Sequence, residues 1–327
     1  MPNQTQVIGI SNAIVDILSQ VNHEFLEEID ATPGSMNLIN ETDAANLYNQ
    51  MTQPKEMSGG SVANTIACFS SFGGNAGYIG QVKNDRWGRI FIDDMVSMGV
   101  DVRLPPAETG SATARSHVLI TDDGQRTMQT FLGACTELSA IDVNEESIGS
   151  TQIILLEGYI WDIPDGEKIA KEVIKLKANS SVKIALSLSD SFCVERHHHA
   201  FSEITQHDTD IIFANENEMM MLTQTKNYED MISEASKLNN LSVITLGGKG
   251  SVIVNGSIIT NEEAVTTQNI VDTTGAGDTY TAAFLYGLTQ DKTIPECAHL
   301  GSWSASKVIQ QIGARLDKDI IGKYEPR

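Results

Sequence analysis

The chain has 327 residues, with 22 basic and 43 acidic side chains, and its formal net charge is −21 at neutral pH. This charge argues against general binding to nucleic acid or to anionic membranes. The hydrophobic content of 41% and the 26 glycines fit a globular α/β protein. Because the chain carries a large negative charge, any phosphate ligand must be held locally, by helix N-termini, a few basic side chains or a metal ion.

The sequence also bears on where the protein works. No apolar run approaches the ~18–20 residues that span a membrane, and residues 1–6 lack the basic and apolar regions of a signal peptide. The cysteines are far apart and form no metal-ligand pair: Cys68, Cys135, Cys193 and Cys297. Free thiols in a reducing compartment are the natural inference, so we expect a cytoplasmic protein.

The first buried strand is predicted at residues 7–10, and residues 13–18 continue extended. Asn12 and Asp16 are four residues apart, so on a strand their side chains share one face. An amide and a carboxylate on one face could bind the diol of a ribose. The alternative is a strand-end asparagine and an exposed aspartate without a ligand.

Paired glycines, Gly59 and Gly60, open a helix that is predicted to run to Phe72. Glycines before a helix permit close approach of the backbone to a ligand. Asn64 falls in the first turns and faces the same entry. A plain structural turn is the alternative.

Residues 113–121 and 127–131 flank the polar turn 122–125, which predicts a strand, a turn and a second strand. Together with the segment around residues 14–40, this hairpin could form a small separate sheet that acts as a lid. Arg126 follows the turn and is a candidate phosphate-binding cation. A solvated hairpin arginine is the alternative.

Strands and helices alternate in the second half of the chain. The predicted strands are 153–156, 183–188, 211–214 and 242–246, and the helices are 166–177, 197–206, 216–222 and 228–239. Such alternation favours a mostly parallel sheet with helices on both faces. Ligands of such sheets bind outside the carboxyl ends of the strands.

Polar residues follow two of these strands directly. Asn215 and Glu218 could face one ligand, and carboxylate oxygen suits hydrated Mg²⁺. Helix capping by Asn215, with Glu218 as the reciprocal acid, is the competing interpretation. Thr245, Gly247 and Gly250 follow the next strand, where the glycines could admit a nucleotide or merely form a turn.

Residues 272–278 read Asp-Thr-Thr-Gly-Ala-Gly-Asp, and the apolar spacing from Tyr280 to Leu288 predicts a helix directly after them. Uncovered N–H groups and the positive end of the helix dipole suit a phosphate. Asp278 would repel a resting anion, which indicates a second partner, a hydroxyl that must lose a proton. An anion hole and a base are the minimum for phosphoryl transfer to an alcohol. A tight turn with an acidic first helical turn is the alternative.

Three adjacent histidines, His197, His198 and His199, suggest a metal site at first sight. Neighbours on a helix point apart, however, and no acidic or cysteine side chain is spaced in the sequence to complete a site. We therefore expect no metal there.

The motifs occur in a specific order. Residues 59–64 and 272–278 flank Asn-x-x-Glu at 215–218 and Thr-x-Gly-x-x-Gly at 245–250. Over nearly its whole length the chain resembles the ribokinase (PfkB) carbohydrate kinases, and within them it is most similar to the adenosine kinases. The stretches similar to that branch are residues 12–16, 187–192 and 305–313.

This resemblance implies a ribokinase-like three-layer α/β sandwich with a mostly parallel central sheet and a small β lid. We expect the large nucleotide-binding domain at residues 1–13, 41–108 and 136–327. The lid is expected at residues 14–40 and 109–135. Such a lid has exposed strand edges, which could pair between two copies of the chain, whereas adenosine kinases as a group are often monomeric. The expected state is therefore a monomer or a lid-mediated homodimer.

The resemblance also implies roles for the candidate residues. The catalytic group would comprise the base Asp278, the anion hole Gly275, Ala276 and Gly277, and Arg126. The acceptor would contact Asn12, Asp16, Gly59, Gly60, Asn64, Phe192 and Trp161. ATP would contact Asn215, Thr245, Gly247, Gly250, Asp272 and Thr274. Glu218 and Asn215 would organise Mg²⁺, and the carbonyls of Asp272 and Thr274 are candidates for K⁺.

Two departures from the family pattern lie in stretches that bear on the acceptor. Val62 occupies a position that is usually small, and Ser187, Asp190 and Ser191 differ from the adenosine kinase stretch. We expect ATP-dependent phosphorylation of the 5′-hydroxyl of adenosine or a related nucleoside. Asp278, with an unperturbed pKa of about 3.9, would be ionised at neutral pH.

The alternatives are a sugar kinase and a nucleoside-binding sensor that has lost catalysis. A sugar-phosphate acceptor would need a basic pocket. The first 110 residues offer few arginines for one, chiefly Arg86, Arg89 and Arg103.

Overall fold

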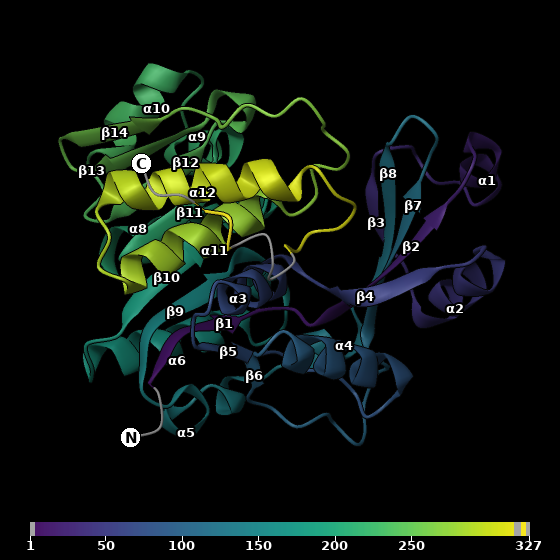
Figure 1. Cartoon of the computed structure of the whole chain (residues 1–327). Helices are drawn as coiled ribbons and strands as arrows, with labels where there is room; N and C mark the ends of the chain where they lie inside the picture. The colour runs from purple at the N-terminus through teal and green to yellow at the C-terminus, as the bar shows by residue number, and fades with distance from the viewer. Residues whose placement is uncertain (1–3, 317–321, 325–327) are drawn as a thin grey trace.

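The computed structural model describes residues 4–316 and 322–324, so the extreme ends of the predicted large domain lie outside it. Within these residues the chain forms two sheets (Figure 1). The large sheet has nine strands in the order β14-β13-β12-β11-β10-β9-β1-β5-β6. They are β1 (Thr5–Ile10), β5 (Ala76–Ile79), β6 (Asp101–Val102), β9 (Thr151–Glu157), β10 (Lys183–Ser187), β11 (Ile211–Asn215), β12 (Leu241–Thr245), β13 (Ser251–Asn255) and β14 (Ile258–Glu262).

The pairing within the large sheet is parallel from β6 to β12. Strand β13 pairs antiparallel with both β12 and β14, so it alone runs against the other strands of this sheet. The predicted strands and helices between residues 153 and 246 are confirmed, with small shifts at their ends. Parallel strands need crossover connections, and these are the helices that the alternating pattern predicted.

Helices cover both faces of the large sheet and form three layers with it (Figure 1). One face is covered by α3 (Ser61–Ser71), α4 (Arg86–Ser97), α11 (Ala276–Thr289) and α12 (Ile294–Val308). The other is covered by α5 (Glu145–Ile148), α6 (Gly166–Ala178), α7 (Ser191–Arg196), α8 (His198–His207), α9 (Glu216–Thr223) and α10 (Tyr228–Ala235). Short 3₁₀ turns are η1 (Gly133–Glu137), η2 (Ala140–Asp142), η3 (Gly158–Asp162) and η4 (Gly247–Lys249).

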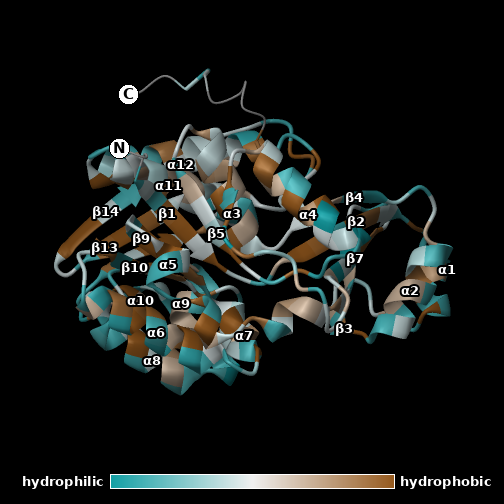
Figure 2. Ribbon diagram, turned by 90° about the horizontal axis from the view of Figure 1, so that it is seen from below, coloured by the Kyte–Doolittle hydropathy of each residue, from teal (hydrophilic) through white to brown (hydrophobic). Residues whose placement is uncertain are grey.

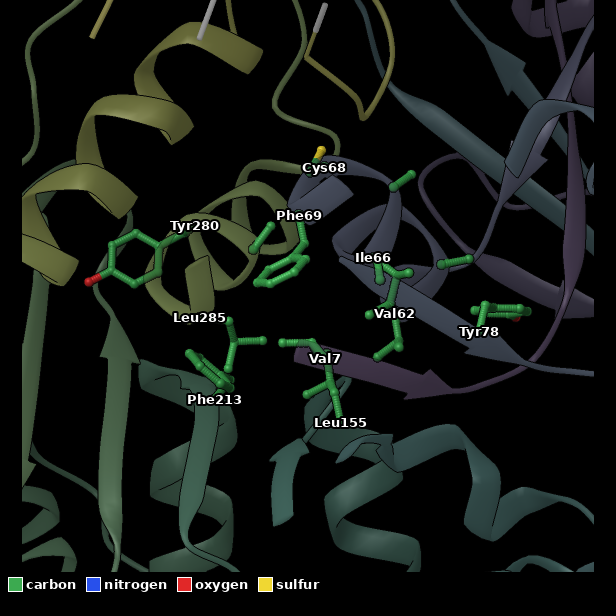
Figure 3. Close-up of a cluster of buried hydrophobic side chains, with 14 of the residues drawn as sticks. Val7, Val62, Ile66, Cys68, Phe69, Tyr78, Leu155, Phe213, Tyr280 and Leu285 are labelled. Carbon is green, nitrogen blue, oxygen red and sulfur yellow. The ribbon is translucent and has the colours of Figure 1, made fainter. Parts of the chain in front are cut away.

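Side-chain alternation along β1 explains the two hydrophobic cores. Val7 points into the cluster beneath α3 and α11, where it lies near Val62 and Leu155 (Figure 3). Ile8 points into the cluster on the opposite face. Because both faces are covered, the strands are hydrophobic almost throughout, and Figure 2 shows them mostly in the hydrophobic colour.

The small sheet has five strands in the order β3-β8-β7-β2-β4 and lies to one side of the large sheet (Figure 1). They are β2 (Ile14–Gln20), β3 (Met36–Leu38), β4 (Lys55–Gly59), β7 (Ala114–Ile120) and β8 (Arg126–Phe131). Helices α1 (His23–Glu28) and α2 (Glu41–Gln50) belong to the same part of the chain, and α2 packs on β7 and β8.

The β7–β8 hairpin matches the predicted strand–turn–strand pattern. Strand β4 was expected in the large part, within residues 41–108, but it belongs to the small sheet. It pairs antiparallel with β2, Ile14 opposite Gly59 and Asp16 opposite Met57. The short strand was missed because Lys55–Gly59 lacks the apolar alternation of a typical strand.

The register of the large sheet brings polar residues together at one edge. Glu157 at the end of β9 lies opposite Ser187 at the end of β10, and Asn215 at the end of β11 lies opposite Thr245 at the end of β12. The carboxyl end of β1 leads into Asn12 at the same edge. No helix within the described ranges is long and apolar enough to cross a membrane.

Candidate active site

The start of α11 is an open helix N-terminus that glycine makes possible. Gly275 is the N-cap residue with a φ of 74°, and a Cβ there would lie 2.5 Å from the backbone of Ala314. Gly277 has no atom within 4 Å of where its Cβ would be, and it lines a cavity of about 110 Å³. The first N–H groups of α11, with the positive end of its dipole, are therefore placed beside a cavity.

Asp278 lies in the first turn of α11 and is held by α3. The Ser61 hydroxyl donates to Asp278 Oδ1 at 2.6 Å, and the Asn64 amide donates to Oδ2 at 3.3 Å. Burial raises the pKa of Asp278 to about 6, against the lowering effects of both hydrogen bonds and of the Arg315 charge. The expectation of an unperturbed pKa was wrong because this carboxylate is removed from water. With a pKa of about 6 the group is still mostly ionised at neutral pH.

The 110 Å³ cavity, here called the phosphate-side cavity, brings several predicted residues together at the carboxyl edge of the sheet. Its polar or glycine lining is Ser61, Thr65, Ser187, Ser189, Asn215, Glu218, Thr245, Gly277, Asp278 and Thr281. Gly247 and Gly250 are outside this lining. A Cβ on Gly250 would lie 2.0 Å from the Glu262 carbonyl oxygen, so the tight turn into β13 explains that glycine.

Asn215 and Glu218 form the capping box that was the competing interpretation. The Asn215 N–H donates to Glu218 Oε2 and the Glu218 N–H donates to Asn215 Oδ1, both at 2.9 Å. Burial raises the pKa of Glu218 to about 7, and the charges of Asp190 and Asp278 add to this. A divalent cation in the cavity would offset this negative charge, so the cap residues fit a hydrated Mg²⁺ as well.

A second cavity, of about 440 Å³, lies between the small sheet and the large part of the chain. We call it the substrate-side cavity. Its lining includes the predicted residues Asp16, Asn64, Arg126 and Thr274. Burial raises the pKa of Asp16 to about 6, and the charges of Arg315 and Arg126 act in the opposite direction.

At the paired glycines, Gly59 and Gly60, the backbone packs closely against other parts of the protein. A Cβ on Gly59 would lie 2.2 Å from the Asp16 carboxylate, and one on Gly60, whose φ is 93°, would lie 2.8 Å from the Asn12 carbonyl oxygen. Asn12 lies 4% exposed, and its Oδ1 has no hydrogen-bond partner among the described residues. Both glycines therefore have a structural role, and Asn12 keeps an unused acceptor beside the site.

Arg126 joins the small sheet to the loop before α11. Its guanidinium donates to the Asp272 carboxylate, which also accepts from the Gly313 and Thr274 N–H groups at 2.9 Å each. Arg126 is thus neither a solvated hairpin residue nor free for a phosphate in this state. A K⁺ site at the carbonyls of Asp272 and Thr274 stays a prediction.

Comparison with known proteins identifies the family. The model of the pfkB family carbohydrate kinases matches residues 26–320. The chain belongs to this family. It is therefore a phosphotransferase that acts on an alcohol group, and the expected ribokinase-like α/β fold is confirmed.

Relatives of this pfkB kinase act on different acceptors. It is 39% identical to the adenosine kinase from Sinorhizobium meliloti, with a TM-score of 0.89 and 96% of each chain covered. It is 37% identical to a probable sugar kinase from Rhizobium etli CFN 42, with a TM-score of 0.89 and 95% of each chain covered. A 5-dehydro-2-deoxygluconokinase from Clostridium botulinum is 24% identical over 290 residues, which cover 83% of this chain and 84% of that protein.

Two aromatic residues expected at the acceptor lie elsewhere in this pfkB kinase. Trp161 is 7% exposed and belongs to the hydrophobic cluster on the sheet face opposite α3 and α11. There its ring packs edge-on against Phe201, with 5.0 Å between the centroids. Phe192 is 71% exposed on α7. Neither lines the two cavities.

The histidine run has an acidic partner that the sequence spacing did not reveal. His197 Nε2 lies 2.7 Å from Asp162 Oδ1, and Cys193 completes a group of three ligand-type side chains within 4.8 Å. Arg196, however, binds both carboxylate oxygens of Asp162, and burial raises the pKa of the Cys193 thiol. We interpret this group as an ion pair with a protonated thiol beside it.

Sequence reasoning missed three residues of the site. Ser61, which binds Asp278, adjoins the recognised glycine pair. Glu157 accepts from the Asn12 and Val62 N–H groups at 2.9 and 3.1 Å, and its position at a strand's carboxyl end was the available signal. Arg315 enters the substrate-side cavity from the segment after α12, and no pattern in the sequence pointed to it.

Alanine at the two glycines at the start of α11 should affect different properties, the stability at Gly275 and the turnover at Gly277. Gly275→Ala should lower the free energy of unfolding by about 1–3 kcal/mol or more, because of its φ and the contact with Ala314. Gly277→Ala should fold normally but lose at least ~10-fold in kcat, because its methyl group enters the phosphate-side cavity. Urea unfolding and ADP release measure the two effects. Equal stability loss in both variants would contradict this view of the helix start.

Proposed function

We propose that this kinase transfers the γ-phosphoryl group of ATP to the 5′-hydroxyl of a nucleoside, with adenosine as the leading acceptor. The observation that carries the proposal is the hydrogen bond between Asn64 and Asp278, which joins the linings of the two cavities. Asp278 lines the phosphate-side cavity, and its partner Asn64 lines the substrate-side cavity. A hydroxyl delivered from one cavity can thus meet a phosphate in the other.

The lining of the substrate-side cavity supports a nucleoside. Apolar side chains form part of its wall: Leu18, Met57, Met98, Val118 and Leu316. A flat base can pack on such a wall, while Asp16 and Asn64 offer a carboxylate and an amide to ribose hydroxyls. The 39% identity to an adenosine kinase supports the same acceptor.

A sugar kinase is the second candidate, favoured by the relatives that act on sugars. The argument from scarce arginines is weaker than expected, because Arg126 and Arg315 reach this cavity from later parts of the chain. Both are paired, however, with Asp272 and Asp94 respectively. Two neutralised arginines favour an uncharged acceptor over a sugar phosphate, whereas Lys55, which also lines this cavity, is the basic group that favours the second candidate.

In the proposed reaction, Asp278 orients the acceptor hydroxyl and accepts its proton late, as the oxygen–phosphorus bond forms and ADP leaves. The first N–H groups of α11 stabilise charge on the transferred group. Glu218 and Asn215 would hold hydrated Mg²⁺, which supplies positive charge beside the phosphates. We expect the small sheet to act as the lid and Arg126 to exchange Asp272 for a phosphate.

A panel of acceptors tests the proposed function. We expect ADP release with adenosine at a kcat/KM at least ~10-fold above that with ribose or fructose 6-phosphate, because only a purine nucleoside fills both the apolar and the polar part of the cavity. Inosine, which is also a purine nucleoside, shows whether the enzyme distinguishes the 6-amino group of adenosine from a 6-oxo group. Higher turnover with a sugar would favour the second candidate. Adenosine binding without any turnover would favour the non-catalytic sensor.

Replacement of the base should separate catalysis from folding. Asp278→Asn should lower kcat by at least ~10³-fold, because the amide cannot accept the proton. It should also raise the Tm at neutral pH, because the folded state disfavours the ionised carboxylate and the amide removes that charge. Steady-state kinetics and thermal unfolding measure both effects. Wild-type-like turnover would exclude Asp278 as the base.

On acidification the enzyme should lose activity at a higher pH than the pKa of an unperturbed aspartate implies. Asp278 must be ionised, so kcat/KM should fall about tenfold per pH unit once the pH drops below about 6. Asp16 ionises in the same range. Profiles from pH 5 to 8 at saturating Mg²⁺, with folding followed by circular dichroism, make the measurement. A profile that is flat down to pH 5 would contradict the burial of the base.

A further inference from the structure

Arg315 occupies a central position that neither the motifs nor the proposed reaction uses. It follows α12 in the chain, and its side chain is 14% exposed. Nε donates to Asn64 Oδ1 at 3.0 Å. Nη1 donates to Ser58 Oγ at 2.6 Å and to Asp94 Oδ2 at 3.1 Å. The guanidinium is thereby fixed by groups from β4, α3 and α4.

The counter-charge of Arg315 is itself fixed. Asp94 on α4 accepts from the Ser58 N–H at 3.0 Å and from the Ser58 hydroxyl. The Ser58 oxygen in turn accepts from Arg315. A bonded pair of this kind limits the positions open to the guanidinium, because Arg donors have a rigid planar geometry.

This anchoring determines which way the Asn64 amide faces. Arginine has donors and no acceptor, so the oxygen of the amide must face Arg315. The NH₂ group then faces Asp278, at 3.3 Å from Oδ2. The flipped amide would place its oxygen against the carboxylate and leave Nε of Arg315 facing a donor.

We propose that Arg315 is a positioning residue that acts through Asn64: it orients the amide so that it donates to Asp278 at the junction of the two cavities. This inference rests on the proposed function, in which Asp278 is the base. In this proposal Arg315 acts on the reacting groups only through Asn64. Its Nε and Nη1 donate to protein groups and Nη2 lies 3.7 Å from Met95 Sδ, so an anionic acceptor would have to compete with these contacts.

The charge of Arg315 supports the same role. It lowers the pKa values of Asp278 and Asp16 against the effect of burial. The other charged groups that act with Asp278 are acidic, namely Asp16 on β2, Glu157 on β9 and Glu218 on α9. Arg315 therefore provides the positive charge that favours an ionised base.

A double-mutant cycle tests whether Arg315 acts through Asn64. The variants are Arg315→Met, Asn64→Ala and the two combined, with the exposed Arg89→Met as the matched control. In the wild-type background Arg315→Met should lower kcat by about 10- to 100-fold, the range for a lost hydrogen bond to a charged group. In the Asn64→Ala background the same change should cost no more than ~3-fold. Arg89→Met should leave kcat unchanged.

The pH profile and a lysine variant separate charge from geometry. Arg315→Met should move the acid limb of kcat/KM to higher pH. Arg315→Lys should leave that limb near its wild-type position, because the charge stays, but should still lower kcat, because lysine has no Nε donor for Asn64. Each variant is first checked by circular dichroism and thermal unfolding. If Arg315→Met fails to fold, the loss of kcat caused by Arg315→Lys is compared instead between the wild-type and the Asn64→Ala backgrounds.

Three results would overturn the inference. They are equal losses of kcat in both Asn64 backgrounds, an unmoved acid limb in Arg315→Met, and a rise in acceptor KM alone, which would make Arg315 a direct substrate ligand. An absence of wild-type turnover with every acceptor of the panel would instead contradict the proposed function, so the two failures are distinguishable.

Discussion

The site depends on one electrostatic constraint, the burial of several carboxylates, three of them at the carboxyl edge of the large sheet and one on β2 of the small sheet. Asp16, Glu157, Glu218 and Asp278 all have pKa values raised by burial. Each is held by hydrogen bonds or lies in a cavity that a cation or a polar ligand can enter. Keeping these carboxylates ionised away from water costs free energy. The arrangement suits a site that binds charged or hydroxyl-bearing molecules, because strongly perturbed pKa values gather at functional sites.

The fold meets this constraint by bringing two helix N-termini to the same place. Helix α3 supplies Ser61 and Asn64, and α11 supplies its open first turn and Asp278. The two helices pack against one another over the sheet (Figure 1). Their shared core, which includes Ile66 and Leu285, fixes the distance between base and partners (Figure 3).

Much of this could be predicted from the sequence, because motifs at strand ends and helix starts carry local signals. The alternating elements after residue 150, the hairpin and the start of α11 all follow from patterns within a short window. Arg315 could not be found this way, because its partners Asn64 and Asp94 are more than 200 residues away in the chain. The burial of Trp161 in the cluster opposite α3 and α11 could not be predicted either, because resemblance gives no information about which face of a sheet a side chain meets.

The path of the chain from β4 into α3 has a consequence for engineering. Strand β4 belongs to the small sheet, and only Gly60 separates it from the helix that carries Ser61 and Asn64. A chimera that exchanges small sheets between relatives therefore cannot be joined at Gly60 without disturbing the catalytic helix. Because β4 is paired with β2 and is joined to α3 through Gly60 alone, β2, β4 and α3 should be inherited together.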